Sequence, residues 1–294
     1  MIVVPEAFSS ERIRKSVDTG RHWIAALPHV IDRLRERWAV ELTEEAPLYG
    51  DWGMVVLGYR RGEPCAMKVS WHEHSTLDEA TALRAWNGRG AVRLLDASPA
   101  DGALLLERLD RARSLEDLDL LSAAEIAGGL MRRLAIPAPP GLPLLTELAA
   151  QTASFVLRRQ AAMASPLPHR WVHLAADLAR DLAIAAGATL VHADLHYGNI
   201  LAGTREPWLA IDPKAIAGDP ELSVPELMWW RLDEAERTAD VRTLLEVLVT
   251  AGDLDPEKAK AWTIVRAVEY WLWGPAAGLT EDPVRCQRLL ETLV

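Results

Sequence analysis

Apolar side chains recur every three to four residues at 21–40, with arginine and glutamate on the opposite face. This spacing predicts an amphipathic helix. At 47–71, short β-type runs alternate with glycine and proline, which predicts a small antiparallel sheet. The pattern then predicts a helix at 78–86 and strands at 91–95 and 103–109. The first part of the chain is therefore expected to combine one sheet with helices.

A polar and basic stretch at 109–115 separates this part from a mainly helical remainder. We place a domain boundary there and expect two domains, residues 1–108 and 109–294, in an α+β protein. The predicted helices of the second domain span 118–134, 144–163, 171–186, 225–237, 240–251, 256–273 and 283–293.

Two short apolar runs flank a polar loop in the second domain. Residues 189–191 lead into the sequence HADLHYGN, and 208–211 end at Asp212. We expect the two runs to form a hairpin, so that Asp194, Asn199 and Asp212 converge. Phosphoryl transfer uses such a set: one carboxylate takes the proton of the attacking hydroxyl, while an amide oxygen and a second carboxylate hold magnesium. The spacing from Asp194 to Asn199 also matches the kinase catalytic loop.

The segments HADLHYGN and IDPK resemble the aminoglycoside phosphotransferase family of small-molecule kinases. REPWLAIDPKAIAGDP is similar to the branch with streptomycin 6-phosphotransferases and hydroxyurea-resistance kinases, and the resemblance runs from about Gly20 to Trp230. It implies a bilobal, protein-kinase-like fold with a small antiparallel-sheet N-lobe, a mostly helical C-lobe and a ligand cleft between them. One departure is Ser223, which stands where the family often has an aspartate in GDP-x-x-D. Ser223 can hydrogen bond but carries no charge.

The resemblance also implies roles for the loop residues. Asp194 would be the catalytic base, and Asn199 and Asp212 would bind magnesium. His192 is expected to hold the loop by hydrogen bonding. His196 either lines the phosphate pocket or is a structural histidine.

Lysine is scarce in this chain, so two lysines near the motifs stand out. Lys214 would contact phosphate or order the loop, with a surface lysine as the alternative. Lys68 lies in an apolar β-type run and would contact the nucleotide phosphates, with a solvated strand face as the alternative. Its expected ion-pair partner is Glu79 in the following helix, and Asp78 and Glu73 are competitors.

Two further nucleotide contacts are expected in residues 1–108. Gly50-Asp51-Trp52-Gly53 is the candidate phosphate-covering loop, and Gly50 and Gly53 would let its backbone approach the phosphates, although plain hairpin turns look the same. The backbone of 106–109, which includes Glu107 and Leu109, would form the hinge that reads the adenine edge.

Acidic residues cluster after Asp212, and together with the net charge of −10 they suggest a cationic acceptor. Glu226, Asp233 and Asp240 would share one helical stripe if the helix ran through them, so that some face the acceptor. Trp230 would add an aromatic wall. A solvated, salt-bridged face is the alternative for the acids, and core packing is the alternative for the tryptophan.

Charge, cysteine content and the length of the apolar runs limit the classes of partner and the location that we expect. The pI of about 5.3 argues against nucleic acid and anionic membrane as main partners. Cys65 and Cys286 suggest no disulfide framework, so reduced thiols and a cytoplasmic setting are the default expectation. The longest apolar run, 182–191, is too short to span a bilayer. Monomer and dimer both remain open.

Together these features predict an enzyme that uses ATP and Mg²⁺ to move the γ-phosphate to a hydroxyl of a small molecule. The resemblance makes an aminoglycoside such as streptomycin the leading acceptor, so the role would be antibiotic resistance. A sugar, metabolite or hydroxyurea kinase is the alternative within the enzymes. A nucleotide-binding pseudokinase that serves as an interaction module is the alternative outside them, but the set Lys68, Asp194, Asn199 and Asp212 is intact.

Overall fold

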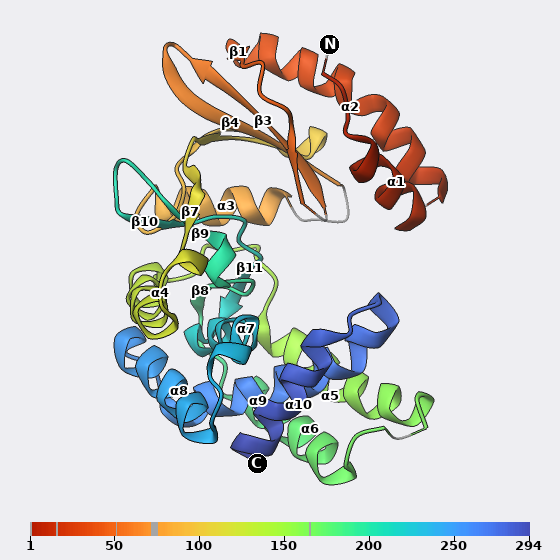
Figure 1. The fold of residues 1–294 in the computed structure, drawn as a ribbon, viewed down its shortest axis with the longest axis vertical. Coiled ribbons are helices and arrows are strands. Elements are labelled where there is room, and N and C mark those ends of the chain that lie inside the picture. Colours follow the sequence, from red (N-terminus) through yellow and green to blue (C-terminus); the bar gives the residue numbers. More distant parts are fainter. Residues whose placement is uncertain (1, 16, 51, 72–75, 165) are drawn as a thin grey trace. The chain divides into compact units, whose positions relative to one another are not determined.

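The computed structural model describes residues 2–15, 17–50, 52–71, 76–164 and 166–294. It contains two compact units (Figure 1). Unit 1 comprises Met1–Gly88 and Val92–Leu109, and unit 2 comprises Arg89–Ala91 and Asp110–Val294. Unit 1 carries the large antiparallel sheet and unit 2 is mostly helical, so the predicted α+β class is confirmed.

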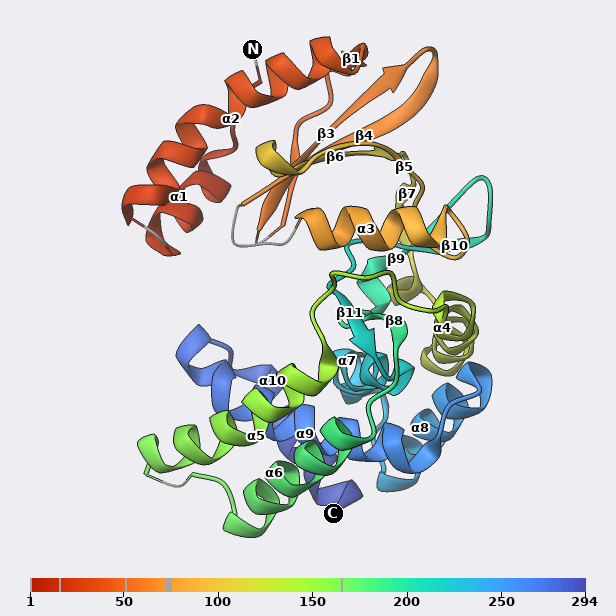
Figure 2. The same cartoon turned by 180° about the vertical axis from the view of Figure 1, so that it is seen from behind.

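Unit 1 is an antiparallel sheet with the α1–α2 pair on one side and α3 on the other (Figure 2). The strand order is β1-β3-β4-β6-β5, and β2 also pairs with β3. The helices are α1 (Glu6–Lys15), α2 (Val17–Arg37) and α3 (Thr76–Trp86). The strands are β1 (Val40–Leu42), β2 (Leu48–Tyr49), β3 (Gly53–Arg60), β4 (Glu63–Ser70), β5 (Leu94–Ser98) and β6 (Ala103–Glu107).

The apolar stripe of α2 explains how that helix attaches to the sheet. Leu27, Ile31 and Leu34 are spaced by four and three residues, so their side chains lie on one face of the helix. All three are buried in one core cluster with Met54 of β3 and Met67 of β4. The helical spacing in the sequence therefore identified the face that packs on the sheet.

The β3–β4 hairpin positions Lys68. Its turn residues Arg61 and Gly62 have φ values of 55° and 82°, the pair of positive angles that a two-residue type I′ turn requires. The turn sets the register, in which Arg60 faces Glu63 and Val55 faces Lys68.

Unit 2 surrounds two small antiparallel strand groups with helices. The three-stranded group has the order β10-β9-β7, and β8 pairs with β11. The strands are β7 (Asp110–Ser114), β8 (Thr189–His192), β9 (Ile200–Ala202), β10 (Trp208–Ala210) and β11 (Ala215–Gly218). The helices are α4 (Leu120–Leu134), α5 (Leu145–Ala162), α6 (His169–Ile184), α7 (Val224–Trp230), α8 (Thr238–Gly252), α9 (Pro256–Trp273) and α10 (Glu281–Leu293).

Three helices of unit 2 pack against strand β8 in one hydrophobic core. Leu145 and Ala149 of α5, Leu182 of α6 and Trp262 of α9 are buried in one cluster with Val191 of β8. Within the described ranges, none of the helices combines the length and the apolarity needed to cross a membrane.

The predicted hairpin between 189–191 and 208–211 is wrong. The run after Thr189 forms β8 and pairs with β11, and the run at Trp208 forms β10 and pairs with β9. A further apolar run, Ile200–Ala202, forms β9 directly after the polar loop and reaches β10 through a short connection, so it is the nearer partner of β10. The motif residues still converge, but through two strand pairs instead of one.

The helix predicted at 225–237 is present but ends seven residues earlier than expected. Helix α7 ends at Trp230, a short 3-10 helix follows at Leu232–Glu234, and α8 begins only at Thr238. Arg231 leaves the helical conformation with φ −124° and ψ 29°. Its guanidinium donates to the carbonyls of Leu115 and Leu118, so tertiary hydrogen bonds override the helical pattern at this point.

Two smaller differences concern the ends of unit 1. The polar stretch at 109–115 contains a strand, β7, which pairs with β9. The strand expected at 91–95 starts at Leu94, and Ala91, which belongs to unit 2, forms an isolated parallel bridge with Ala210 of the same unit.

Candidate active site

Two strand pairs bring the predicted catalytic residues of unit 2 together. In the β8–β11 pair, His192 faces Ala215, and the N–H of Ala193 donates to the carbonyl of Lys214 at 2.9 Å. The β9–β10 ladder continues with the N–H of Ile211, which donates to the carbonyl of Asn199 at 2.9 Å. Asp194 follows the first pair and Asp212 follows the second, so the backbone alone places the three motif residues in one neighbourhood.

Both ring nitrogens of His192 form hydrogen bonds that hold this part of the backbone. Its side chain is buried, Nε2 donates to the carbonyl of Ile211 at 2.9 Å, and Nδ1 accepts from the N–H of Asp194 at 3.3 Å. Burial lowers the pKa of His192 from its usual value, which favours the neutral ring that this donor–acceptor pattern needs. The expected loop-holding hydrogen bonds are therefore present.

Ser223 bonds the backbone of the same histidine. Its hydroxyl is buried and donates to the carbonyl of His192 at 2.9 Å. The position where the family often has an aspartate is thus occupied by a neutral donor that contacts the loop directly. Ser223 hydrogen bonds as expected, without adding charge near Asp194.

Asp194 and Lys214 form an ion pair. Lys214 Nζ lies 3.0 Å from Asp194 Oδ2, and the Asp194 side chain is 26% exposed. The carboxylate is thus partly accessible, and the ammonium group of Lys214, the residue just before β11, balances its charge. The structure brings Lys214 to the predicted base.

Asn199 and Asp212 offer hard oxygen atoms beside Asp194. The side-chain nitrogen of Asn199 donates to the carbonyl of Asp194 at 2.9 Å, so the amide oxygen is the atom that Asn199 offers to a cation. Asp212 has φ 55°, a left-handed conformation that few residues other than glycine adopt. Strained backbone of this kind concentrates at functional sites. An amide oxygen and a carboxylate fit the donor preference of Mg²⁺.

His196 is fixed by a tryptophan. Its ring stacks on Trp230 with centroids 3.7 Å apart and an interplanar angle of 13°. Trp230 Nε1 in turn donates to Glu116 Oε1 at 2.5 Å. Burial lowers the pKa of His196 to about 4, so the ring is neutral at physiological pH. Trp230 therefore lies beside the loop, and it orients His196.

Glu116 is a residue that the sequence did not single out. Glu116 lies in the stretch that follows β7, and its carboxylate would lie 3.2 Å from a Cβ placed on Gly198. Gly198 thus lets the loop pack closely between Glu116 and His196. The only sequence signal for Glu116 is its place in SLED, a capping box whose Ser114 and Asp117 bond each other's backbone.

In unit 1, Lys68 and Glu79 form a buried ion pair. Lys68 Nζ lies 2.8 Å from both Glu79 carboxylate oxygens, and the side chains are 13% and 7% exposed. Strand β4 presents the lysine and the first turn of α3 presents the glutamate. The pair is the expected one; of its competitors, Glu73 lies outside the described residues.

The other predicted nucleotide contacts also lie in unit 1. The N–H of Gly50 donates to the carbonyl of Gly53 at 3.1 Å, which closes a tight turn between β2 and β3, while Asp51 lies outside the described residues. Glu107 ends β6 and Leu109 is the last residue of unit 1. The N–H of Glu107 donates to the carbonyl of Arg93 at 3.0 Å, so an adenine contact by Glu107 would use its carbonyl.

Two of the three acids predicted to share the acceptor-facing stripe, Glu226 and Asp233, have different surroundings. Glu226 is buried in α7 and pairs with Arg266 of α9 at 3.2 Å. Burial raises the pKa of Glu226 to about 7, against the lowering effect of Arg266. Asp233 is largely exposed and pairs with Arg285 of α10 at 2.5 Å. With α7 ending at Trp230, these acids do not share one helical stripe.

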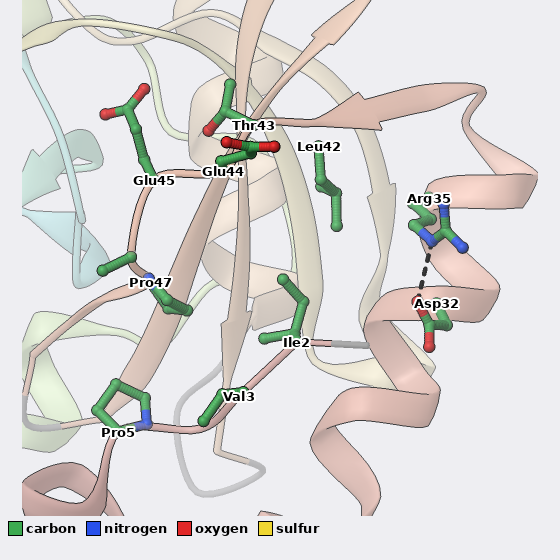
Figure 3. Close-up of a pocket in the computed structure, with 11 residues that line it drawn as sticks. Ile2, Val3, Pro5, Asp32, Arg35, Leu42, Thr43, Glu44, Glu45 and Pro47 are labelled. Carbon is green, nitrogen blue, oxygen red and sulfur yellow. Dashed lines mark hydrogen bonds and ion pairs between the residues drawn. The ribbon is translucent and has the colours of Figure 1, made fainter.

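A cavity in unit 1 is unrelated to these predictions. It has a volume of about 620 Å³, and Figure 3 shows its lining by the N-terminal segment, α2 and the stretch from β1 to β2. None of its lining residues is a predicted contact for nucleotide, metal or acceptor.

Comparison with known proteins places this geometry in context. Residues 37–278 match the family described as aminoglycoside/hydroxyurea antibiotic resistance kinase. A streptomycin 6-kinase from Streptomyces glaucescens is 36% identical, with 93% of this chain and 91% of that protein covered. A hydroxyurea phosphotransferase from Kitasatospora aureofaciens is 35% identical, with 100% of this chain and 86% of that protein covered.

Solved structures share the fold at low sequence identity. Aminoglycoside phosphotransferase APH(4)-Ia, as a thermostable mutant in a ternary complex with ADP and hygromycin B, aligns with a TM-score of 0.61 at 16% identity and covers 89% of this chain and 97% of its own. Choline kinase LicA from Streptococcus pneumoniae aligns with a TM-score of 0.59 at 15% identity and covers 90% of this chain and 99% of its own.

Proposed function

Since the chain belongs to the aminoglycoside/hydroxyurea antibiotic resistance kinases, a family of small-molecule phosphotransferases, we propose that it transfers the γ-phosphate of ATP to a hydroxyl group of an aminoglycoside such as streptomycin. The observation that carries this proposal is the anchoring of Asp194. His192 binds its N–H, the Asn199 amide binds its carbonyl, and Lys214 pairs with its carboxylate.

Asp194 is proposed as the base that accepts the proton of the attacking hydroxyl. A general base must be accessible and fixed within hydrogen-bond reach of the proton that it takes. Asp194 meets both conditions, because its backbone is bonded on either side and its carboxylate is partly exposed. Lys214 would balance the charge on the carboxylate and hold its orientation between turnovers.

Asn199 and Asp212 are proposed to hold Mg²⁺ through their side-chain oxygens. When bound, the ion neutralises negative charge on the nucleotide phosphates. The hydrogen bond from the Asn199 nitrogen to the carbonyl of Asp194 supports this assignment, because it fixes which amide atom faces a cation.

Lys68 is proposed to bind the nucleotide phosphates, with Glu79 as the group that orients it. A lysine loses much side-chain entropy when it is ordered, and two contacts of 2.8 Å to Glu79 restrict it before the ligand arrives. The turn at Gly50 and Gly53 and the backbone from Glu107 to Leu109 are proposed as further nucleotide contacts.

Hydroxyurea is the second candidate acceptor. The hydroxyurea phosphotransferase and the streptomycin 6-kinase are nearly equal in identity to this chain, so sequence similarity ranks neither acceptor first. Cys65 and Cys286 are buried free thiols, which fits a reducing compartment such as the cytoplasm as the place of reaction.

A screen for acceptor-dependent ADP release tests the proposal. Purified protein is given ATP and Mg²⁺ with streptomycin, other aminoglycosides, hydroxyurea or simple sugars, and the product is identified by its mass. We expect ADP release with an aminoglycoside and a product heavier by one phosphoryl group. EDTA should abolish both turnover and the thermal stabilisation by ATP. A shift of Tm by ATP that EDTA leaves unchanged would contradict the metal assignment, and turnover with sugars alone would contradict the acceptor assignment.

A further inference from the structure

Arg231 fixes the segment that follows β7 against the end of α7. It comes directly after α7, and its guanidinium donates to the carbonyls of Leu115 and Leu118 at 3.0 and 2.7 Å. These two residues bracket Glu116, so the backbone on both sides of Glu116 is held in place. The same guanidinium lies 5.4 Å from the centroid of the Tyr197 ring, which belongs to the HADLHYGN loop. Arg231 thus holds the Glu116 segment beside this loop.

A line of direct contacts leads from Glu116 into the HADLHYGN loop. Glu116 Oε1 accepts the indole N–H of Trp230 at 2.5 Å, and the Trp230 ring stacks on the His196 ring with centroids 3.7 Å apart. The carbonyl of His196 accepts from the N–H of Asn199 at 2.9 Å. A displaced Trp230 ring therefore disturbs the backbone between Asp194, the proposed base, and Asn199, the proposed metal ligand.

Gly198 brings the loop backbone close to the same glutamate oxygen. A Cβ on Gly198 would lie 3.2 Å from Glu116 Oε1 and 3.2 Å from His196 Nδ1, tighter than ordinary van der Waals contact. The oxygen that binds the Trp230 indole thus also borders the loop. Glu116 is exposed on its other side, so its replacement by a smaller residue leaves no buried cavity.

We propose that Glu116 is a positioning residue for phosphoryl transfer. Through Trp230 and His196 it fixes the loop that carries Asp194 and Asn199. A misplacement of about 1 Å in an active site can cost on the order of 100-fold in rate, so a contact outside the reacting atoms can set kcat. The inference rests on the proposed function, because it needs Asp194 as the base. It assigns the effect of Glu116 to a hydrogen bond and not to its charge.

Three single variants test this assignment through kcat, acceptor KM and ATP KM. Glu116→Ala removes the acceptor of the indole N–H, and Trp230→Phe removes the N–H but keeps an aromatic ring for His196. We expect each to lower kcat by on the order of tenfold, while both KM values stay within about twofold of the wild type. Glu116→Gln keeps an oxygen that can accept the N–H and should retain at least about half of the wild-type kcat.

The double variant Glu116→Ala/Trp230→Phe tests whether the two residues act as one unit. Both single changes break the same hydrogen bond, so the double variant should also lose on the order of tenfold in kcat. A loss equal to the product of the single losses, on the order of 100-fold, would mean that the residues act separately and would overturn the inference. Wild-type kcat in Glu116→Ala would overturn it as well.

The position of His196 can be followed without turnover. The chain has eight histidines, and a His196→Gln variant identifies the His196 ring signals in an NMR spectrum of histidine-labelled protein. The ring current of Trp230 acts on these signals. They should move in Glu116→Ala and stay near their wild-type positions in Glu116→Gln. Glu125→Ala, which changes an exposed glutamate of α4, is the matched control and should alter neither the signals nor kcat.

The remaining outcomes separate this inference from its rivals and from the proposed function. Equal losses of kcat in Glu116→Ala and Glu116→Gln would assign the effect to the charge and overturn the inference. A raised acceptor KM with unchanged kcat in both variants would place Glu116 on the acceptor and also overturn it. If the wild type phosphorylates no acceptor, the proposed function fails. His196 signals that still move in Glu116→Ala then support the positioning of the loop, and unmoved signals overturn it.

Discussion

Two buried ion pairs, one in each unit, differ in how their partners are brought together. Lys68 and Glu79 are 13% and 7% exposed, and Arg266 and Glu226 are 23% and 8% exposed. Their burial is thus similar. The partners of the first pair are eleven residues apart, on one strand and the helix that follows it. The partners of the second pair are forty residues apart, on α7 and α9.

This difference explains why only the pair of Lys68 and Glu79 could be predicted from the sequence. A lysine in an apolar strand followed by an acid in the first turn of a helix is a local pattern, and the chain between them restricts where they can meet. The second pair exists because α7 packs against α9, an arrangement that no short segment encodes. We therefore expect the first pair to govern the nucleotide and the second to govern stability and the acceptor side.

Loss of Arg266 should have the largest effect on stability. At about pH 8, above the pKa of Glu226, Arg266→Ala leaves the buried carboxylate without its cation, and breaking a buried pair in this way typically costs about 3–5 kcal/mol. Urea denaturation measures the change in unfolding free energy. The double variant Arg266→Ala/Glu226→Gln should recover part of the loss, since it removes the buried charge. A loss below about 1 kcal/mol in the single variant would show that the pair is solvated.

Loss of Lys68 should mainly affect the nucleotide. Lys68→Ala is expected to lower kcat/KM for ATP by on the order of 100-fold, about 3 kcal/mol, with little change in acceptor KM. Lys260→Ala on α9 is the control and should change neither constant. A Lys68 variant with near wild-type kcat/KM for ATP would remove the functional difference between the two pairs.

The pH dependence of stability should identify Glu226. Its pKa in the folded protein is raised to about 7, chiefly by burial, so the folded state holds a proton that the unfolded state releases at lower pH. Stability is therefore fully present below the unfolded pKa and is lost as pH rises toward 7, by up to about 3 kcal/mol.

Glu226→Gln removes this titration. Chemical denaturation at several pH values should show a shallower fall of unfolding free energy between about pH 5 and 8 in the variant than in the wild type. Arg266, Asp194 and Lys214 also act on this carboxylate, so the comparison is made within one buffer series. Equal slopes in the two proteins would mean that Arg266 keeps Glu226 ionised throughout.

The smallest expected effect concerns Ser223. Ser223→Ala removes one buried hydrogen bond to the carbonyl of His192 and should cost about 1 kcal/mol, seen as a Tm lower by a few degrees. Ser154→Ala, an exposed serine that bonds within its own helix, should leave Tm unchanged. A Ser223→Ala variant with wild-type Tm would show that the neutral residue contributes nothing to the loop.

Most of the fold could be predicted from local patterns in the sequence. The helical spacing of Leu27, Ile31 and Leu34 and the turn at Arg61–Gly62 depend on neighbouring residues, and both were readable. The pairing of β8 with β11 was not, because the sequence does not show which of several short apolar runs lies nearest in space. The end of α7 was missed because Arg231 bonds the carbonyls of Leu115 and Leu118, more than a hundred residues away in the chain.

The residues of the candidate site also fall into those that the sequence predicted and those that it did not. Asp194, Asn199 and Asp212 lie within one segment, so their convergence followed from the motif even though the strand pairing was wrong. Glu116 and Arg266 come from other helices and loops. Their positions depend on tertiary packing, and no motif marks them.

The most direct test of the account compares Asp194→Asn with Asp177→Asn, an exposed aspartate on α6. Turnover with the best acceptor and ATP affinity are measured for both variants. If Asp194 is the base, its substitution lowers kcat by about 10²–10⁴-fold and leaves ATP affinity nearly unchanged, while the control matches the wild type in both. Near wild-type turnover by Asp194→Asn would contradict the mechanism, and loss of ATP binding would show that Asp194 serves the nucleotide instead.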